Sequence, residues 1–499
     1  MSTIIGNYVG GSRLNQKGGT LQEVYNPSTG EVSAKVRFTS ESEIDEVVEV
    51  ASAATPLWSA TAPSKRSQVM YRFKDLLEKN ADKIASAISS EHGKTHNDAL
   101  GEVSRGLEAV EFSCGIPHLL KGTYSEQVAT SIDVYSIPQP LGIVAGITPF
   151  NFPAMVPMWM FPNALACGNA FILKPSERDP SVSLILADLL KKAGLPDGIF
   201  NVVQGDKVAV DAILDHPKIM AVSFVGSTPI AEYIYTRAAG KGKRVQALGG
   251  AKNHMIIMPD ADMDQAVDAL MGAGYGSAGE RCMAISVPVP VGDKVADELM
   301  DRMVPLVEKL PIGPPNDSNA AMGPVITKQS LERIISLIES GVNQGAKLLV
   351  DGRGIKIPRH ENGFFIGGSL FDKVTAEMDI YREEIFGPVL STVRVPDYEA
   401  AIDLVQSNPY ANGVAIFTRE GDAARDFVNR IEVGMVGINV PIPVPVGYHS
   451  FGGWKKSIFG SHHIYGPDTI HFYTRIKAVT SRWPNGIKAG AEFNFPTNT

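Results

Sequence analysis

Apolar residues recur along most of the chain at two spacings, one typical of helices and the other of buried strands. The helical spacing is clear in residues 40–54, where one face would carry Ile44, Val47, Val48 and Ala51. Ser40 and Glu43 have the spacing of a capping box at the start of that helix. The continuous runs "GIVAGI" (142–147) and "AFILK" (170–174) are typical of strands buried on both faces of a parallel sheet. The alternation predicts a doubly wound α/β domain up to about residue 250.

A second α/β pattern occupies residues 250–445, where strand-like runs at 254–258 and 285–291 flank a helix-like run. Two segments stand apart because their apolar residues alternate with period two: "TSIDVYSIPQP" (130–140) and "IHFYTRIKAV" (470–479). We expect these distant strands to pair as a small extra sheet that serves in oligomerisation.

Composition narrows the class of protein. The 499 residues are 44% hydrophobic and 20% charged, which fits a compact soluble protein with two or three domains. A net charge of −8 without a Lys/Arg cluster argues against a nucleic-acid partner. We expect no membrane association, because there is no secretory signal pattern and no apolar run of the roughly 20 residues that span a bilayer. Three cysteines cannot form a disulfide framework, which indicates a reducing, cytoplasmic compartment.

One cysteine has an unusual setting. In "GSAGERCMAISV" (276–287), Cys282 follows small residues that would let a substrate approach, and Arg281 would favour the thiolate. A catalytic nucleophile and a small buried hydrophobic residue both fit this pattern. Cys114 and Cys167 lie in apolar settings that indicate packing.

Polar residues in apolar surroundings offer further candidate chemistry. Asn151 lies in "TPFNFP" (148–153), where its amide is either satisfied by the structure or free to act as an oxyanion donor. Lys174 and Glu177 follow a predicted strand, where such a pair could hold ribose hydroxyls or form a solvated ion pair.

The segment "FVGSTPI" (224–230) joins a predicted strand to a predicted helix. Thr228 would cap the helix, and the free N–H groups near Gly226 and Ser227 would suit a pyrophosphate. An ordinary strand–helix turn also fits, because the full G-x-G-x-x-G fingerprint is absent. Glu384, which follows another glutamate, fits either a solvated face or a contact with a cofactor sugar.

As an ordered set, these motifs resemble the aldehyde dehydrogenase superfamily over about residues 20–490, with a specificity that no single motif has. The set comprises "TPFNFP", "LKPSE", "FVGST", "LGG", the glycine-rich approach to Cys282, "EEIFGPV" and "FGGWKKS". The resemblance implies an α/β fold with a Rossmann-type cofactor domain, an α/β catalytic domain and a small bridging β-sheet. The implied boundaries are 1–122 and 141–249 for NAD binding, 250–445 for catalysis, and 123–140 and 465–499 for the bridging or oligomerisation strands.

The resemblance also assigns roles to residues. Cys282 would be the nucleophile and Asn151 the oxyanion donor. The implied NAD contacts are Phe150, Lys174, Glu177, Gly226, Ser227, Glu384 and Phe386. No metal site is implied.

One departure from the superfamily pattern concerns the acceptor of the acyl group. Hydrolytic members carry a glutamate directly before "LGG", whereas this chain has Ala247, which cannot take a proton. With "GERCMA" and "FGGWKKS", this resembles the methylmalonate-semialdehyde dehydrogenases, which transfer the acyl group to coenzyme A. That resemblance implies substrate recognition by Arg105 and Arg281. From helical spacing alone, Arg105 fits either a surface position or the wall of a tunnel.

The expected protein is therefore an NAD-dependent, CoA-acylating dehydrogenase. It would oxidise methylmalonate or malonate semialdehyde through a Cys282 thioester, with decarboxylation to propionyl-CoA or acetyl-CoA. We expect a cytoplasmic homotetramer, a dimer of dimers, whose partners are small molecules. One alternative is a hydrolytic NAD-dependent aldehyde dehydrogenase that gives a free acid, which the alanine at position 247 disfavours. The other is a non-catalytic protein of the same fold, which the presence of both Cys282 and Asn151 disfavours.

Overall fold

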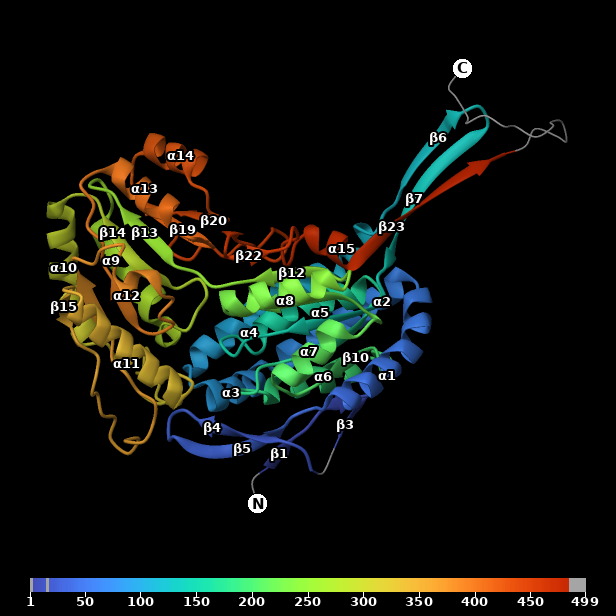
Figure 1. Ribbon diagram of the computed structural model, residues 1–499, viewed down its shortest axis with the longest axis horizontal. Coiled ribbons are helices and arrows are strands. Elements are labelled where there is room, and N and C mark those ends of the chain that lie inside the picture. The colour runs from blue at the N-terminus through green and yellow to red at the C-terminus, as the bar shows by residue number, and fades with distance from the viewer. Residues whose placement is uncertain (1–2, 15–17, 484–499) are drawn as a thin grey trace.

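The computed structural model describes residues 3–14 and 18–483, and its largest sheet has eight strands there (Figure 1). Their order is β22 (Ile458–Phe459), β12 (Arg244–Leu248), β11 (Ile219–Val225), β8 (Ile143–Ile147), β9 (Ala170–Lys174), β10 (Phe200–Val202), β2 (Tyr8–Val9) and β3 (Ser12–Arg13). The five central strands pair in parallel, and the edge strands pair antiparallel. The predicted buried runs are β8 and β9, every residue of which is buried.

Four helices follow β5 (Glu31–Arg37) in the chain, and four more follow strands β8, β9, β10 and β11 of this sheet. They are α1 (Glu41–Ala60), α2 (Pro63–Lys79), α3 (Ala81–His92), α4 (His96–Cys114), α5 (Met155–Ala166), α6 (Ser181–Lys192), α7 (Lys207–Asp215) and α8 (Thr228–Gly240). Helix α1 begins with the predicted capping box of Ser40 and Glu43. Helix α5 is buried along its whole length, because it packs between the sheet and α4 (Figure 1).

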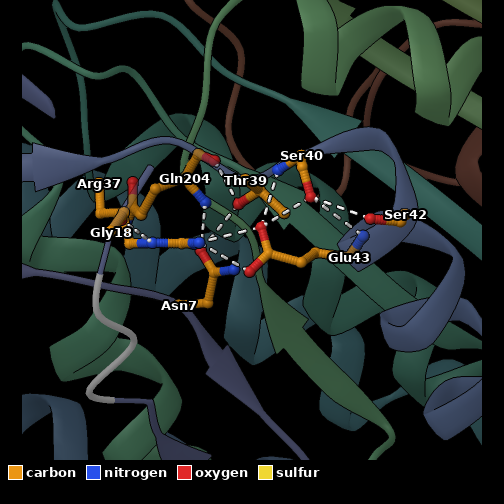
Figure 2. A network of polar contacts seen from close by, with 8 residues as sticks. All are labelled: Asn7, Gly18, Arg37, Thr39, Ser40, Ser42, Glu43 and Gln204. Carbon is orange, nitrogen blue, oxygen red and sulfur yellow. Dashed lines mark hydrogen bonds and ion pairs between the residues drawn. The ribbon is translucent and has the colours of Figure 1, made fainter. Parts of the chain in front are cut away.

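A polar network ties the N-terminal segment to this sheet (Figure 2). The small sheet there contains β1 (Thr3–Ile5), β5 (Glu31–Arg37) and β4 (Leu21–Asn26). Asn7 Oδ1 accepts hydrogen bonds from Thr39 Oγ1 at 3.0 Å and from the Gln204 main-chain N–H at 2.9 Å. Arg37 pairs with Glu43 at 2.8 Å, so β5 is joined to the first turn of α1.

The second α/β unit is built on a parallel four-stranded sheet: β14 (Ile285–Pro290), β13 (Asn253–Ile257), β19 (Gly413–Phe417) and β20 (Met435–Ile438). Its helices are η2 (Gly276–Gly279), α9 (Met263–Tyr275), α10 (Asp293–Glu308), α11 (Lys328–Asn343), α12 (Asp379–Arg382), α13 (Tyr398–Ser407) and α14 (Gly421–Arg430). Smaller strands beside it are β15 (Lys347–Val350), β16 (Ser369–Asp372), β17 (Val389–Ser391), β18 (Tyr410–Ala411) and β21 (Trp454–Lys455). Each unit has its own hydrophobic core.

A three-stranded antiparallel arm projects from the body in Figure 1. It contains β6 (Thr123–Ala129), β7 (Ile132–Pro140) and β23 (Thr474–Arg482), so the two period-two segments do pair. The predicted strand at 470–479 is wrong at its start, because residues 470–473 belong to α15 (Asp468–Tyr473). The side chains of Phe472 and Tyr473 are buried there in the first core, which overrides the alternating pattern.

The predicted α/β class, with two α/β units and a small additional sheet, is confirmed. The domain boundaries stay predictions. The predicted bridging segment 465–499 lies outside the described residues after 483, as do residues 1–2 and 15–17 of the predicted first domain.

Candidate active site

A cavity of about 600 Å³ lies between the two α/β units, at the carboxyl ends of β11 and β12. Its lining includes seven of the predicted site residues: Phe150, Asn151, Gly226, Ser227, Cys282, Glu384 and Phe386. Lys174, Glu177, Arg105 and Arg281 lie outside that lining. A second cavity, of about 580 Å³ between α3 and residues 314–320, contains none of the predicted residues.

The main chain at Cys282 is fixed from two sides. The side-chain amides of Asn253 and Asn412 both donate to the Cys282 carbonyl oxygen, at 2.9 and 3.3 Å. Asn253 begins β13, and Asn412 lies immediately before β19. The thiol is therefore held at the cavity by the central strands of the second sheet.

The glycines before Cys282 make room for the protein itself, a role that the sequence does not predict. A Cβ atom on Gly274 would lie 2.7 Å from the side chain of Leu390. One on Gly279 would lie 2.2 Å from the carbonyl oxygen of Gly387. Both distances are shorter than van der Waals contact, so a larger residue at either position would displace the segment that carries the thiol.

The thiolate of Cys282 is not favoured in the free protein. Burial raises the pKa of the thiol to about 12, and the negative charge of Glu384 adds to the shift. Arg281 lowers this pKa, as the sequence predicts, but its effect is smaller than that of burial. The guanidinium of Arg281 forms an ion pair of 2.6 Å with Asp98 on α4. Arg281 and Cys282 together line a small cavity of about 20 Å³.

The amide of Asn151 is free to act. Asn151 as a residue is only 3% exposed. Within residues 3–14 and 18–483 its side chain makes no hydrogen bond to the protein, and its amide atoms are not among the fully enclosed unpaired polar atoms, so they reach open space. The amide lines the cavity together with Cys282. A structural asparagine would be hydrogen-bonded by the protein, whereas an unpaired amide that lines the cavity favours an oxyanion donor.

The N-terminus of α8 faces the cavity through Gly226 and Ser227. The predicted cap by Thr228 is wrong: Ser227 occupies the cap position without a side-chain hydrogen bond, and Thr228 Oγ1 accepts one from Gly250 N at 2.8 Å. A Cβ atom on Gly226 would lie 2.4 Å from the ring of Phe224. The bare turn and the positive end of a 13-residue helix fit a cofactor pyrophosphate.

Lys174 and Glu177 pair with each other across 3.2 Å at the end of β9. The next residue, Arg178, does line the cavity, and its guanidinium lies 4.9 Å above the ring of Phe150. The ring of Phe150 in turn meets Phe386 edge to face, with 5.7 Å between centroids. Arg178 and these two rings therefore form part of the lining that Cys282 shares, whereas Lys174 and Glu177 lie outside it.

Glu384 lines this cavity, and the pKa of its carboxyl group lies near neutral pH. Burial raises its pKa to about 7, against the opposing effects of a hydrogen bond from Ala251 N at 3.0 Å and of Lys252. Ala247 lies inside β12, fully buried and opposite Phe224 and Phe459 in the sheet. Position 247 thus offers no proton acceptor.

Arg105 is one-third exposed and is engaged by the protein. Its guanidinium pairs with Glu108 at 2.8 Å and donates to the carbonyl oxygens of Val444 and Pro445 at 3.2 and 3.0 Å. It lines a cavity of about 10 Å³ with, among others, Trp159. The structure therefore places Arg105 and Arg281 on different small cavities, each with an acidic partner from α4.

Sequence reasoning misses several charged residues around the site: Lys94, Asp98, Glu102, Glu108 and Arg178. A signal for two of them exists, because Asp98 and Glu102 precede Arg105 at helical spacings of seven and three and so share a face of α4 with it.

No helix among residues 3–14 and 18–483 is long and apolar enough to cross a membrane.

Comparison with known proteins identifies relatives along nearly the whole chain. The family model described as the aldehyde dehydrogenase family matches residues 14–479. A malonate-semialdehyde dehydrogenase of Pseudomonas aeruginosa is 59% identical, over 96% of this chain and 97% of its own length. An acylating, mitochondrial methylmalonate-semialdehyde dehydrogenase of Arabidopsis thaliana is 48% identical, over 99% and 81%.

A crystal structure gives the same result. It is that of a candidate methylmalonate-semialdehyde dehydrogenase from Sinorhizobium meliloti 1021 complexed with NAD. It is 60% identical in sequence, covers 98% of this chain and 100% of its own, and superposes with a TM-score of 0.97.

Proposed function

The chain belongs to the aldehyde dehydrogenase family, and we propose that it is an NAD-dependent, CoA-acylating dehydrogenase of methylmalonate and malonate semialdehyde. The products would be propionyl-CoA and acetyl-CoA after loss of CO₂. One observation supports this most strongly: Cys282 and an unpaired Asn151 amide share a cavity with the N-terminus of α8. The names of the relatives supply the substrate class and the acyl transfer.

In the proposed reaction, Cys282 loses its proton and its sulfur attacks the aldehyde carbon. Glu384, whose pKa is raised to about 7, is the group of the cavity suited to accept that proton near neutral pH. The side-chain N–H of Asn151 and the main-chain N–H of Cys282 would stabilise the oxyanion. NAD, when bound, accepts the hydride that leaves the former aldehyde carbon. The resulting β-carboxy thioester would lose its carboxylate as CO₂, and the enolate that remains would take a proton at its α-carbon. The propionyl or acetyl thioester would then pass its acyl group to the thiol of CoA, whose proton returns to the Cys282 sulfur.

The residues proposed to hold NAD are those of the cavity wall, Phe150, Gly226, Ser227, Glu384 and Phe386, with Lys174 and Glu177 beyond it. Arg105 and Arg281 are proposed to bind the carboxylate of the semialdehyde. Each would exchange its acidic partner on α4 for the substrate.

The arm is proposed as the oligomerisation surface of a homotetramer built from dimers. Large apolar side chains lie exposed on it, with Tyr124 at 63%, Ile476 at 62% and Trp483 at 63%. Such a patch on a projecting sheet edge favours burial against a second copy. We further propose the domain boundaries given above and a cytoplasmic location, for which the three unpaired cysteines speak.

Product analysis tests the proposal against hydrolysis, which Glu384 favours as the alternative because it could also activate water. The enzyme is incubated with methylmalonate semialdehyde, with NAD or CoA omitted in turn. We expect sustained NADH formation and an acyl-CoA product only in the complete mixture, and a single burst without CoA. Sustained turnover to a free acid without CoA would contradict acyl transfer to CoA. Cys282→Ala should abolish the burst while NAD still binds.

A further inference from the structure

A buried ion pair lies beneath the segment that carries Asn151. Lys94 and Glu102 have fully buried side chains, and Lys94 Nζ lies 2.8 Å from Glu102 Oε2. Lys94 follows Gly93, which ends α3 in the left-handed conformation (φ 95°). A Cβ atom on Gly93 would lie 2.8 Å from the side chain of Pro324, so a larger residue does not fit in the turn that precedes Lys94.

Both charges also bind the main chain of residues 151–155. Lys94 Nζ donates to the carbonyl oxygen of Asn151 at 2.7 Å. Glu102 Oε1 accepts from the N–H groups of Ala154 at 2.8 Å and Met155 at 3.1 Å. The ion pair therefore binds the main chain of this segment at its first residue, Asn151, and at its last two, Ala154 and Met155.

The same contacts replace a missing helix cap. Helix α5 begins after Ala154, whose side chain cannot accept a hydrogen bond from the first turn. Glu102 supplies that acceptor from the neighbouring helix α4. Lys94 Nζ also lies 4.3 Å from the centroid of the Phe152 ring, so the residue after Asn151 is held as well.

A buried ion pair such as Lys94–Glu102 contributes little to the stability of the fold. Removing two charges from water costs free energy that their attraction often fails to recover, and an apolar pair of similar volume can serve as well or better. The main-chain contacts give the pair a different use. They fix the peptide from which the unpaired Asn151 amide reaches into the cavity.

We propose that Lys94 and Glu102 are positioning residues that hold Asn151 where it can stabilise the oxyanion. This inference rests on the proposed function, in which Asn151 is the oxyanion donor. A displacement of about 1 Å in a positioned group can cost about a hundredfold in rate, and the loss of one oxyanion donor costs about 10²–10³-fold. Lys94→Met and Glu102→Gln should therefore lower the rate of the chemical step by about 10- to 100-fold, less than Asn151→Ala does.

The experiment measures the rate constant of the NADH burst with semialdehyde and NAD in the absence of CoA. Both variants are made in the wild-type chain and in Asn151→Ala. If the pair acts through Asn151, each variant slows the wild-type burst but changes the Asn151→Ala burst by less than about twofold. NAD affinity and the alkylation rate of Cys282 should stay at their wild-type values. The burst of the wild-type enzyme itself tests the proposed function separately.

Lys243→Met is the matched control. Lys243 is also a buried lysine whose Nζ donates to main-chain carbonyls, including that of Ile219 at 2.7 Å, but it precedes β12 at the opposite end of the sheet. Its loss should lower the melting temperature and leave the burst rate unchanged. If Lys94→Met does not fold, Glu102→Gln decides alone, since it keeps the volume of the side chain. Wild-type burst rates in the folded variants, or equal losses in both backgrounds, would overturn the proposal.

Discussion

The competition between Glu108 and a substrate carboxylate for Arg105 can be measured. In the free protein this guanidinium is held by Glu108 at 2.8 Å and by two carbonyl oxygens of residues 444–445. A semialdehyde acid that binds Arg105 must displace the glutamate. Removing Glu108 should therefore improve recognition of the acid, whereas removing Arg105 should weaken it.

The solvent exposure of the Arg105–Glu108 ion pair determines how large the change in kcat/KM should be. The side chains of Arg105 and Glu108 are 35% and 36% exposed, so their attraction is worth only about 0.2–1 kcal/mol. A charge-assisted contact with the substrate contributes about 1.5–3 kcal/mol. The difference leaves about 0.5–2.8 kcal/mol, so Arg105→Ala should lower kcat/KM for the acid by roughly 2- to 100-fold. Glu108→Gln should raise it by roughly 1.4- to 5-fold.

The assay compares kcat/KM for methylmalonate semialdehyde with that for propionaldehyde, which has no carboxylate. Their ratio cancels any loss of active enzyme. Arg302→Ala is the matched control, because Arg302 pairs with Glu298 at a similar exposure on α10, in the other unit. Wild-type ratios in both Arg105→Ala and Glu108→Gln would show that Arg105 does not bind the carboxylate. The same comparison on Arg281→Ala tests the second arginine.

Three further predictions concern the groups that line or adjoin the cavity. Asn151→Ala should lower turnover by about 10²–10³-fold, and a folded variant with normal turnover would make the amide structural. The pKa of the Cys282 thiol is raised to about 12, so between pH 7 and 9 its thiolate fraction increases about tenfold per pH unit. The rate of alkylation by iodoacetamide should increase by the same factor, and a plateau below pH 8 would refute this. Ala247→Glu should shorten the lifetime of the thioester without CoA, measured as faster NADH release after the burst, and an unchanged slow phase would show that a base at this position cannot reach the acyl group.

The sequence predicts the fold well where side-chain pattern alone decides the element. Continuous apolar runs correspond to the buried strands β8 and β9, and the capping box marks the start of α1. The pattern fails at residues 470–473, where tertiary burial of a short helix produces the same alternation as a strand. The role of the glycines near Cys282 also escapes sequence reasoning, because it depends on Leu390 and Gly387, more than a hundred residues away.

The site is predictable to the extent that its residues stand in recognisable motifs. Cys282, Asn151 and the turn at Gly226 meet at one cavity, as an ordered set of motifs implies. The pKa of the Cys282 thiol, by contrast, cannot be predicted from the sequence motif. The neighbouring Arg281 indicates a thiolate, but burial and the charge of Glu384 outweigh it, and both depend on the folded environment.

Three of the residues that sequence reasoning misses, Asp98, Glu102 and Glu108, lie on one helix, α4, and this explains both their omission and their importance. Helical spacing alone leaves open whether the faces of α4 away from its apolar residues are solvated or packed, so the sequence assigns no partners to them. In the fold those faces carry Asp98, which holds Arg281, and Glu102, which holds the start of α5 through its pairing with Lys94. One turn further, Arg105 reaches residues 444–445. Because one rigid element sets the oxyanion donor and both arginines, a shift of α4 would change carboxylate recognition and the chemical step together, and substitutions at Glu102 and Glu108 separate the two.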